Sequence, residues 1–239
     1  RLVEVPHIVD NIRAILGRNS DLAGRSVVVS AGGTQEPIDP ARVITNRSSG
    51  KMGYAVAEAA RDRGANVTLV TAPTFLPTPG RVDMKYVTTV ADMRQAVLSA
   101  CVGADVLIMA AAVSDYRPAQ VASQKIKKEE EDGRGMTIDL VKNADFFLEV
   151  PEGVLRVGFA AESENLLVNA RKKIASKGLA LIAANDITAP DSGFNVDTNI
   201  VTMIDRDGGM EELPLLSKYD VGHRILDRVV QLLSGPRAP

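Results

Sequence analysis

The stretch Ser26-Val-Val-Val-Ser-Ala-Gly-Gly33 decides the fold. Its short run of β-branched residues predicts a buried strand, and the two glycines mark the end of that strand. A helix is predicted over 51–63 with Gly64 as its cap, and a second apolar run at 67–70 predicts the next strand. A strand, a helix and a strand in this order form the unit from which parallel sheets are built.

The rest of the chain continues this alternation. Further helices are predicted over 7–17, 91–102, 162–177 and 219–233, and further strands over 105–112, 154–159 and 179–184. The runs 199–204 and 210–215 predict an antiparallel hairpin. We expect an α/β fold: a Rossmann-like three-layer sandwich with a mainly parallel sheet and a C-terminal β-hairpin extension. Residues 1–19 are expected to form a linker with an N-terminal helix, and residues 20–239 a single domain.

The composition agrees with this fold and excludes several classes of protein. Hydrophobic residues make up 45% of the 239 residues but aromatic residues only 4%, so small aliphatic side chains must build the core. The net charge of −2 argues against bulk nucleic-acid binding. The single cysteine, Cys101, allows no internal disulfide, which suits a reducing, cytoplasmic location. No apolar run reaches the roughly 18 residues of a membrane span, and residues 1–20 do not have the pattern of a signal peptide.

The segment 32–50, between the first strand and its helix, is too long for a dinucleotide-binding turn. Such a turn is a short Gly-x-Gly-x-x-Gly loop, and the second strand of that fold ends in an acidic residue that holds a ribose. Here the second strand is followed by Thr71-Ala72-Pro73. An NAD(P)-dependent oxidoreductase is therefore the weaker alternative. A non-catalytic nucleotide-binding regulatory module is a second alternative.

The end of this segment, Ser48-Ser-Gly-Lys-Met-Gly53, has the composition of a phosphate cradle. Backbone N–H groups at a helix N-terminus attract anions, and glycine lets an anion approach the backbone. The other interpretation is that Ser48 and Ser49 only cap the helix. Spacing alone leaves both open. A second segment, 117–135, is rich in Lys and Glu and is predicted to be a mobile loop.

Residues 31–53 closely resemble the signature of the phosphopantothenoylcysteine synthetases. Further blocks agree with that family in the same order: 110–118, 125–128, 158–162, 184–186 and 193–195. The resemblance covers about residues 20–234, and residues 1–17 resemble the linker that follows a flavin-dependent decarboxylase in bacterial bifunctional proteins. One departure is Ala144, where many bacterial members carry proline near the region that recognises the base.

The resemblance implies a ligase of coenzyme A biosynthesis. The carboxylate of 4′-phosphopantothenate would attack the α-phosphorus of CTP, with loss of pyrophosphate, and the amine of L-cysteine would then displace CMP. Because this step brings two anions together, Mg²⁺ is expected with the nucleotide. A homodimer is also implied, with the 199–215 hairpin as a pairing device, the active site near the interface and a flavin-dependent decarboxylase as a fused or separate partner.

The resemblance also assigns roles to individual residues. Lys125 would stabilise the charge of the transition state, Asn46 and Arg42 would bind the acyl substrate, and Asn46 is a second catalytic candidate. Asp115 is the candidate for the metal. The nucleotide would contact Gly33, Ser48, Ser49, Gly50, Gly53, Ala112, Asp115, Lys142, Asp145, Phe159, Lys173 and Lys177, with Ala160 next to Phe159.

Each of these residues also has a purely structural interpretation. Lys125 is one lysine in a solvated run of charge, and Asn46 is a turn former. Asp115 could pair with Arg117, and Phe159 could belong to the core. Lys173 and Lys177 could extend along the surface of their helix.

Overall fold

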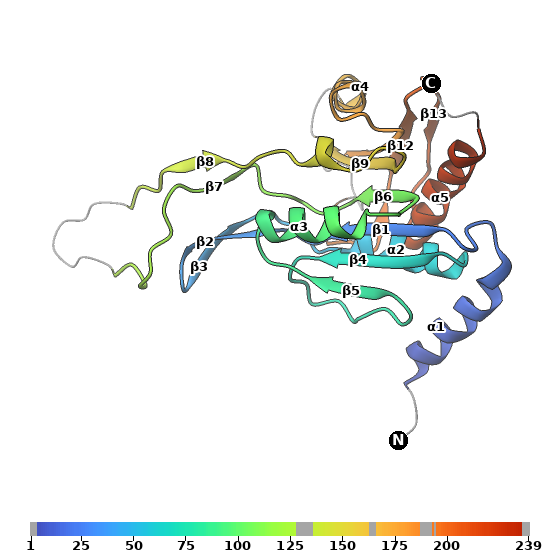
Figure 1. Cartoon of the computed structure of the whole chain (residues 1–239), viewed down its shortest axis with the longest axis horizontal. Coiled ribbons are helices and arrows are strands. Elements are labelled where there is room, and N and C mark those ends of the chain that lie inside the picture. The colour runs from blue at the N-terminus through green and yellow to red at the C-terminus, as the bar shows by residue number, and fades with distance from the viewer. Residues whose placement is uncertain (1–3, 128–135, 163–165, 187–192, 194, 236–239) are drawn as a thin grey trace.

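The computed structural model describes residues 4–127, 136–162, 166–186, 193 and 195–235. An eight-stranded sheet forms its centre, in the order β13-β12-β10-β9-β6-β1-β4-β5 (Figure 1). The strands are β1 (Ser26–Ala31), β4 (Asn66–Thr71), β5 (Asp83–Tyr86), β6 (Val106–Met109), β9 (Leu155–Glu162), β10 (Leu181–Asp186), β12 (Val201–Asp205) and β13 (Met210–Glu212). All neighbours from β5 to β10 are parallel. This is the strand order of a doubly wound nucleotide-binding fold.

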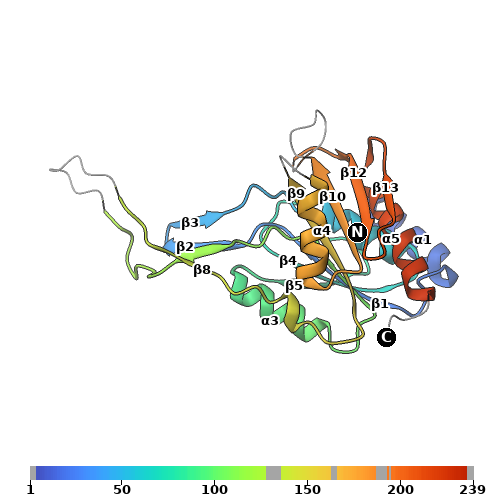
Figure 2. The same cartoon turned by 90° about the horizontal axis from the view of Figure 1, so that it is seen from above.

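Helices cover both faces of the sheet, which confirms the expected three layers (Figure 2). One face packs against α2 (Lys51–Asp62) and α5 (Lys218–Ser234), and the other against α3 (Val90–Ala100) and α4 (Leu166–Lys177). In β1, Val27 and Val29 belong to the first core and Val28 to the second. Alternate side chains of a strand point to opposite faces, so a strand buried on both sides must be apolar throughout.

The predicted C-terminal hairpin is present as β12 and β13, and it extends the main sheet. β12 pairs antiparallel with β10, and β13 pairs antiparallel with β12. The buried Asp205 carboxylate shapes the turn, since it accepts hydrogen bonds from the backbone N–H of Asp207 and of Gly209, each at 2.9 Å. The hairpin therefore forms the antiparallel edge of an otherwise parallel sheet.

Two segments predicted as loops contain strands. Residues 32–50 hold the hairpin of β2 (Gln35–Asp39) and β3 (Arg42–Thr45), and residues 83–86 form β5, the last strand of the sheet. β5 lacks an apolar run because only one of its edges is paired, and most of its side chains are exposed. In the predicted loop 117–135, residues 117 and 118 belong to β7 (Tyr116–Pro118), which pairs with β8 (Leu140–Lys142), while residues 119–127 form no helix or strand. Residues 128–135 of that prediction lie outside the described residues.

We call β2–β3 and β7–β8, with residues 119–127 and 136–139, the arm. The arm extends away from the sheet, on the opposite side from α1 (Figures 1 and 2). Asp39, which is 2% exposed, ties its two parts together. Its carboxylate accepts a hydrogen bond from the backbone N–H of Ile126 at 3.1 Å and lies 3.1 Å from the Arg42 guanidinium. Polar contacts therefore hold a stretch that composition alone predicts to be mobile.

Short elements complete the chain. They are α1 (Val5–Leu16), the 3-10 helices η1 (Gly17–Asn19) and η2 (Phe147–Glu149), and the small pair of β11 (Thr198–Asn199) with β14 (Leu216–Ser217). Among the described residues, no helix is both long and apolar enough to cross a bilayer.

Buried ion pairs and hydrogen bonds hold α1 against the rest of the domain. The Arg61 guanidinium, 2% exposed, donates to the carboxylates of Asp62 and Asp10 at 2.8 and 3.1 Å and to the carbonyl oxygen of Gly80 at 2.9 Å. Asp10 also accepts from the Gly80 backbone N–H. The polar side of α1 thus faces the domain.

Arg61→Met should lower the free energy of unfolding by about 3–5 kcal/mol, because it leaves buried carboxylates without their cation. Urea unfolding followed by circular dichroism measures this change. The matched control is Asp83→Asn, which breaks the exposed pair of Asp83 with Lys85 and should cost less than about 1 kcal/mol. Equal effects of the two substitutions would contradict the importance of the buried pair.

Candidate functional site

A pocket of about 650 Å³ opens at the carboxyl ends of the central strands. Segments that follow β1 and β6 line it, together with β9, β10 and the first turn of α2. β1 continues to β4 on one side of the sheet, while β6 begins the other half, so the pocket lies where the winding reverses. In open α/β sheets, ligands bind at this point because the connecting loops diverge there.

One end of the pocket is the N-terminus of α2. Ser48, Ser49 and Gly50 line it, as the sequence suggested. Gly50 is the N-cap residue of α2 and has a φ of 78°, so neither serine occupies the cap position. The two hydroxyls lie 3.4 Å from the backbone nitrogens of Gly50 and Lys51. The hydroxyls thus accept hydrogen bonds from backbone N–H groups at the helix start, as capping residues do, and the same residues line the pocket, as a phosphate cradle would.

Gly33 and Gly53 are close by but do not line the pocket. A Cβ atom on Gly53 would lie 2.7 Å from the Ser30 carbonyl oxygen, and one on Gly33 would lie 2.9 Å from the Asn46 carbonyl oxygen. Gly53 lets α2 pack closely on β1, and Gly33 lets residue 46 cross the end of the strand. The structure therefore gives both glycines a packing role.

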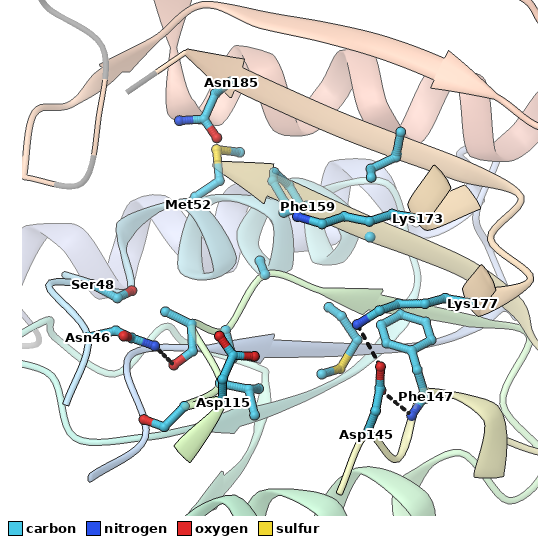
Figure 3. A pocket seen from close by; sticks show the side chains of 18 of the residues that line it. Asn46, Ser48, Met52, Asp115, Asp145, Phe147, Phe159, Lys173, Lys177 and Asn185 are labelled. Carbon is cyan, nitrogen blue, oxygen red and sulfur yellow. Dashed lines mark hydrogen bonds and ion pairs between the residues drawn. The ribbon is translucent and has the colours of Figure 1, made fainter. Parts of the chain in front are cut away.

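Asn46, Ala112 and Asp115 lie together in the pocket (Figure 3). The Asn46 amide donates to the carbonyl oxygen of Ala112 at 3.2 Å, which joins the cradle segment to the segment after β6. Arg117 does not form the alternative ion pair with Asp115. Its guanidinium donates a hydrogen bond to the side-chain oxygen of Asn143 at 2.9 Å. The Asp115 carboxylate is exposed at the pocket, where it can meet a cation or a hydroxyl.

The other end of the pocket is basic. Lys142, Lys173 and Lys177 line it, and Figure 3 shows Lys177 reaching Asp145. The Lys177 ammonium lies 2.9 Å from the Asp145 carboxylate and 5.5 Å from the centre of the Phe147 ring. Burial acts to raise the pKa of Asp145, but hydrogen bonds from Lys177 and from the Phe147 backbone N–H hold it below its ordinary value. Asp145 thus stays ionised and fixes the position of Lys177.

Apolar groups form the wall between the two ends. Phe159 is half-buried and lines the pocket as expected, whereas Ala160 is 1% exposed and belongs to the core. Alternate residues of β9 point to opposite faces of the sheet, so only one of these neighbours can face the pocket. Phe159 offers a flat surface to a base or ribose.

Lys125 and Arg42 are not brought into the pocket. Both lie on the arm, where the Arg42 guanidinium donates to the carbonyl oxygen of Ile126. Lys125 is exposed, and neither residue lines the pocket of its own chain. Lys125 and Arg42 lie close in sequence to other motifs of the family, so the sequence did not reveal that they are separated from the pocket. The arm carries both residues away from the sheet.

The sequence analysis assigned no individual role to several residues of the pocket, among them Met52, Asn185, Asn199 and Lys218. Asn185 could have been found, since it is a polar residue at the end of the apolar strand β10. Met52 lies within the quoted stretch 48–53, whereas Asn199 and Lys218 carried no such signal. They belong to elements distant in sequence, which meet only in the folded chain.

Comparison with known proteins gives consistent results. Residues 22–233 match the family model described as "DNA/pantothenate metabolism flavoprotein C-terminal domain". The coenzyme A biosynthesis bifunctional protein CoaBC of Bacillus subtilis strain 168 is 46% identical over 218 residues, which are 90% of this chain and 53% of that protein. CoaBC of Escherichia coli K12 is 43% identical over 236 residues, or 96% of this chain and 57% of that protein. This chain therefore spans about half the length of these relatives.

Solved structures share the fold. The crystal structure of the C-terminal domain of a CoaBC protein has a TM-score of 0.76 and 39% identity, and the match covers 90% of this chain and 98% of that one. The DNA/pantothenate metabolism flavoprotein of Streptococcus pneumoniae has a TM-score of 0.74, with 87% of this chain and all of that one covered, and at 22% identity it supports the fold alone. The chain belongs to the DNA/pantothenate metabolism flavoprotein C-terminal domain family.

Proposed function

We propose that this chain is a phosphopantothenate–cysteine ligase that uses CTP to activate 4′-phosphopantothenate in coenzyme A biosynthesis. One observation carries the proposal: a helix N-terminal cradle and three lysines face the same pocket. The pocket has the size of those that hold small ligands, and its two cationic ends suit a ligand with several phosphates. The CoaBC names of the relatives place them in coenzyme A biosynthesis.

The reaction has two steps. A carboxylate oxygen of 4′-phosphopantothenate forms a bond to the α-phosphorus of CTP, and the bond from that phosphorus to pyrophosphate breaks. The nitrogen of cysteine then forms a bond to the acyl carbon, CMP leaves with the electron pair, and the amine proton passes to solvent. The chain needs no nucleophile of its own. Its task is to hold the anions and stabilise the charge that develops.

The residues of the pocket can divide this task. The cradle of Ser48, Ser49 and Gly50 binds phosphate oxygens through backbone N–H groups. Lys173 and Lys177 add positive charge at the other end, and Asp145 orients Lys177. Asn46 presents an amide to the acyl substrate, and Phe159 presents a ring to the base.

Mg²⁺ fits the pocket as a companion of the nucleotide. Among the described residues, no group of three or more His, Cys, Asp or Glu side chains could hold a metal. Mg²⁺ commonly binds one or two carboxylates together with substrate phosphates. Asp115 is the carboxylate available for this role, since Asp145 is paired with Lys177. When bound, the ion would neutralise phosphate charge.

The half-length match to bifunctional relatives supports a flavin-dependent decarboxylase as fused or separate partner. We place the ligase domain at residues 20–239, and the family model matches residues 22–233. We also place the enzyme in the cytoplasm.

Burial raises the pKa of the Cys101 thiol to about 11, so this cysteine is an unreactive core residue.

Two copies of the chain would complete the site. The arm exposes a set of large apolar side chains: Val43, Tyr116, Val121, Ile126, Met136, Leu140 and Val141. Such a surface is typical of an interface. Pairing through the arm, rather than through the 199–215 hairpin, would bury these side chains. It would also explain why Lys125 lies outside the pocket of its own chain, because Lys125 would act in the pocket of the second copy.

Pyrophosphate release measured with each of the four nucleoside triphosphates tests the reaction. CTP with 4′-phosphopantothenate should release pyrophosphate at least about tenfold faster than ATP, if the pocket forms hydrogen bonds specific to cytosine. Equal rates would contradict the choice of CTP. CTP binding without pyrophosphate release would favour the regulatory module, and binding of NADPH in place of CTP would favour the oxidoreductase.

Ser48→Asp tests the cradle. A carboxylate beside the bound phosphate should weaken CTP binding about tenfold or more by charge repulsion. Ser48→Asn is the matched control, because it adds a similar volume without charge and should retain most of the affinity. Isothermal titration calorimetry measures both. A normal CTP affinity for Ser48→Asp would show that the phosphates bind elsewhere.

A mixture of two impaired variants, assayed at a CTP concentration well below the Kd of the unmodified protein, tests whether Lys125 acts on the partner copy. Lys125→Gln should lower the rate of pyrophosphate release about a hundredfold by removing a charged donor from the transition state. Co-expression with Ser48→Asp should restore about a quarter of the activity, since half of the dimers are then mixed and each has one intact site. If Lys125 acts within its own chain, no activity returns. A protein that is monomeric at assay concentration would contradict the dimer.

A further inference from the structure

Residues 193 and 195–199, which we call the clamped segment, cross the first turn of α2 beside the pocket. Two of them, Gly193 and Asn199, line the pocket together with Met52 of α2. Asn199 is 3% exposed, and its side-chain amide lies 4.0 Å from the sulfur of Met52. The clamped segment is thus one wall of the pocket, and what holds it in place decides the shape of the site.

Lys218, the first residue of α5, is one of two lysines that hold the clamped segment. Its side chain is buried, and its ammonium donates to the carbonyl oxygens of Gly193 at 2.8 Å, of Val196 and of Thr198 at 3.3 Å. An ammonium has three N–H donors, so the three carbonyls use all of them. Lys218 borders the pocket, but all three of its donors are used by carbonyl oxygens of the protein. Lys218 is therefore suited to hold the clamped segment and not to bind the ligand.

Lys51, the first residue of α2, holds the segment from the other side. Its ammonium donates to the carbonyl oxygen of Asn195 and to the carboxylate of Asp197, each at 2.7 Å. This hydrogen bond holds the pKa of Asp197 below its ordinary value. The sequence Gly50-Lys51 at a helix start resembles the Gly-Lys pair with which many proteins grip phosphate. Here the Lys51 ammonium is turned to the clamped segment, and Lys51 does not line the pocket.

We propose that Lys218 and Lys51 are positioning residues, which clamp residues 193 and 195–199 against α2 and so preform the wall of the nucleotide pocket. The inference rests on the proposed nucleotide site. Because each lysine holds different atoms of one segment, the loss of either one frees part of the same wall. Ordering this wall before the nucleotide arrives removes that entropic cost from binding. The effect should therefore fall on nucleotide affinity and on KM, with little change in kcat.

Amide hydrogen exchange and calorimetry test the clamp on the ligand-free and CTP-titrated protein. In Lys218→Met, the peptide covering 195–200 should exchange about tenfold faster or more, because hydrogen bonds from a charged donor are lost. The Kd and KM for CTP should rise by a similar factor, while kcat stays within about twofold. Lys51→Gln should show the same pattern, and Lys51→Arg should restore the original values, since a guanidinium can also bridge a carbonyl and a carboxylate.

Lys85→Met is the matched control, because Lys85 forms an exposed pair with Asp83 on β5 and should change neither measurement. Unchanged exchange and unchanged CTP affinity in Lys218→Met and Lys51→Gln would overturn the proposal. A fall in kcat at constant KM would also overturn it, in favour of direct catalysis. If Lys218→Met does not fold, the partly exposed Lys51 decides the outcome alone. If the unmodified protein does not bind CTP, the proposed function fails, while the exchange data still report on the clamp.

Discussion

The parallel pairing of β1 with β6 is the constraint on which the rest of the structure depends. It joins the two halves of the sheet, and it continues past the strand ends through a bridge between Gly33 and Ala112. Beyond the bridge, the hydroxyls of Thr34 and Ser114 lie 3.2 Å apart, and the Thr34 hydroxyl accepts the backbone N–H of Ser114 at 2.9 Å. These contacts hold the two diverging loops together at their bases, so that a pocket opens above them.

The same constraint determines where charge can collect. The loop after β1 ends in the N-terminus of α2, and the loop after β6 passes Asp115 on its way to the arm. Lysines from β8 and α4 line the other end of the pocket. The protein has a net charge of only −2, so its capacity to bind an anion comes from this local convergence and not from a general excess of positive charge.

Rigid and extended parts of the chain have different tasks. The lysines of the basic end are built on β8 and α4, and the cradle leads directly into α2; regular elements hold groups in place more accurately than free loops do. The clamped segment is irregular up to β11 (Thr198–Asn199), and two lysines, the buried Lys218 and the partly exposed Lys51, hold it in place. The arm, which includes Lys125 and Arg42, extends out of the body of the molecule (Figure 1). In the proposed dimer, the pocket of one copy would be preformed around the nucleotide, and the arm of the second copy would complete it.

The sequence by itself determined the α/β class, the alternation of elements and the family resemblance, and it predicted either a phosphate cradle or a helix cap at the start of α2. It could do so because buried parallel strands must be apolar on both faces and because a long signature such as 31–53 is specific. It did not reveal β5, the β2–β3 hairpin or the pairing of β7 with β8, since exposed and edge strands need no apolar run.

For the site, the sequence supplied the residues of the cradle and the lysines of α4, and the structure placed them in one pocket. Only the tertiary structure decided that Gly33 and Gly53 serve packing, that Lys125 lies outside its own pocket, and that Lys218 and Lys51 hold a distant segment. Lys218 and Gly193 are 25 residues apart, and Lys51 and Asn195 are 144 apart. The physical reason is that a hydrogen bond between such distant residues leaves no local pattern; it exists only when the folded sheet brings the two chain segments together.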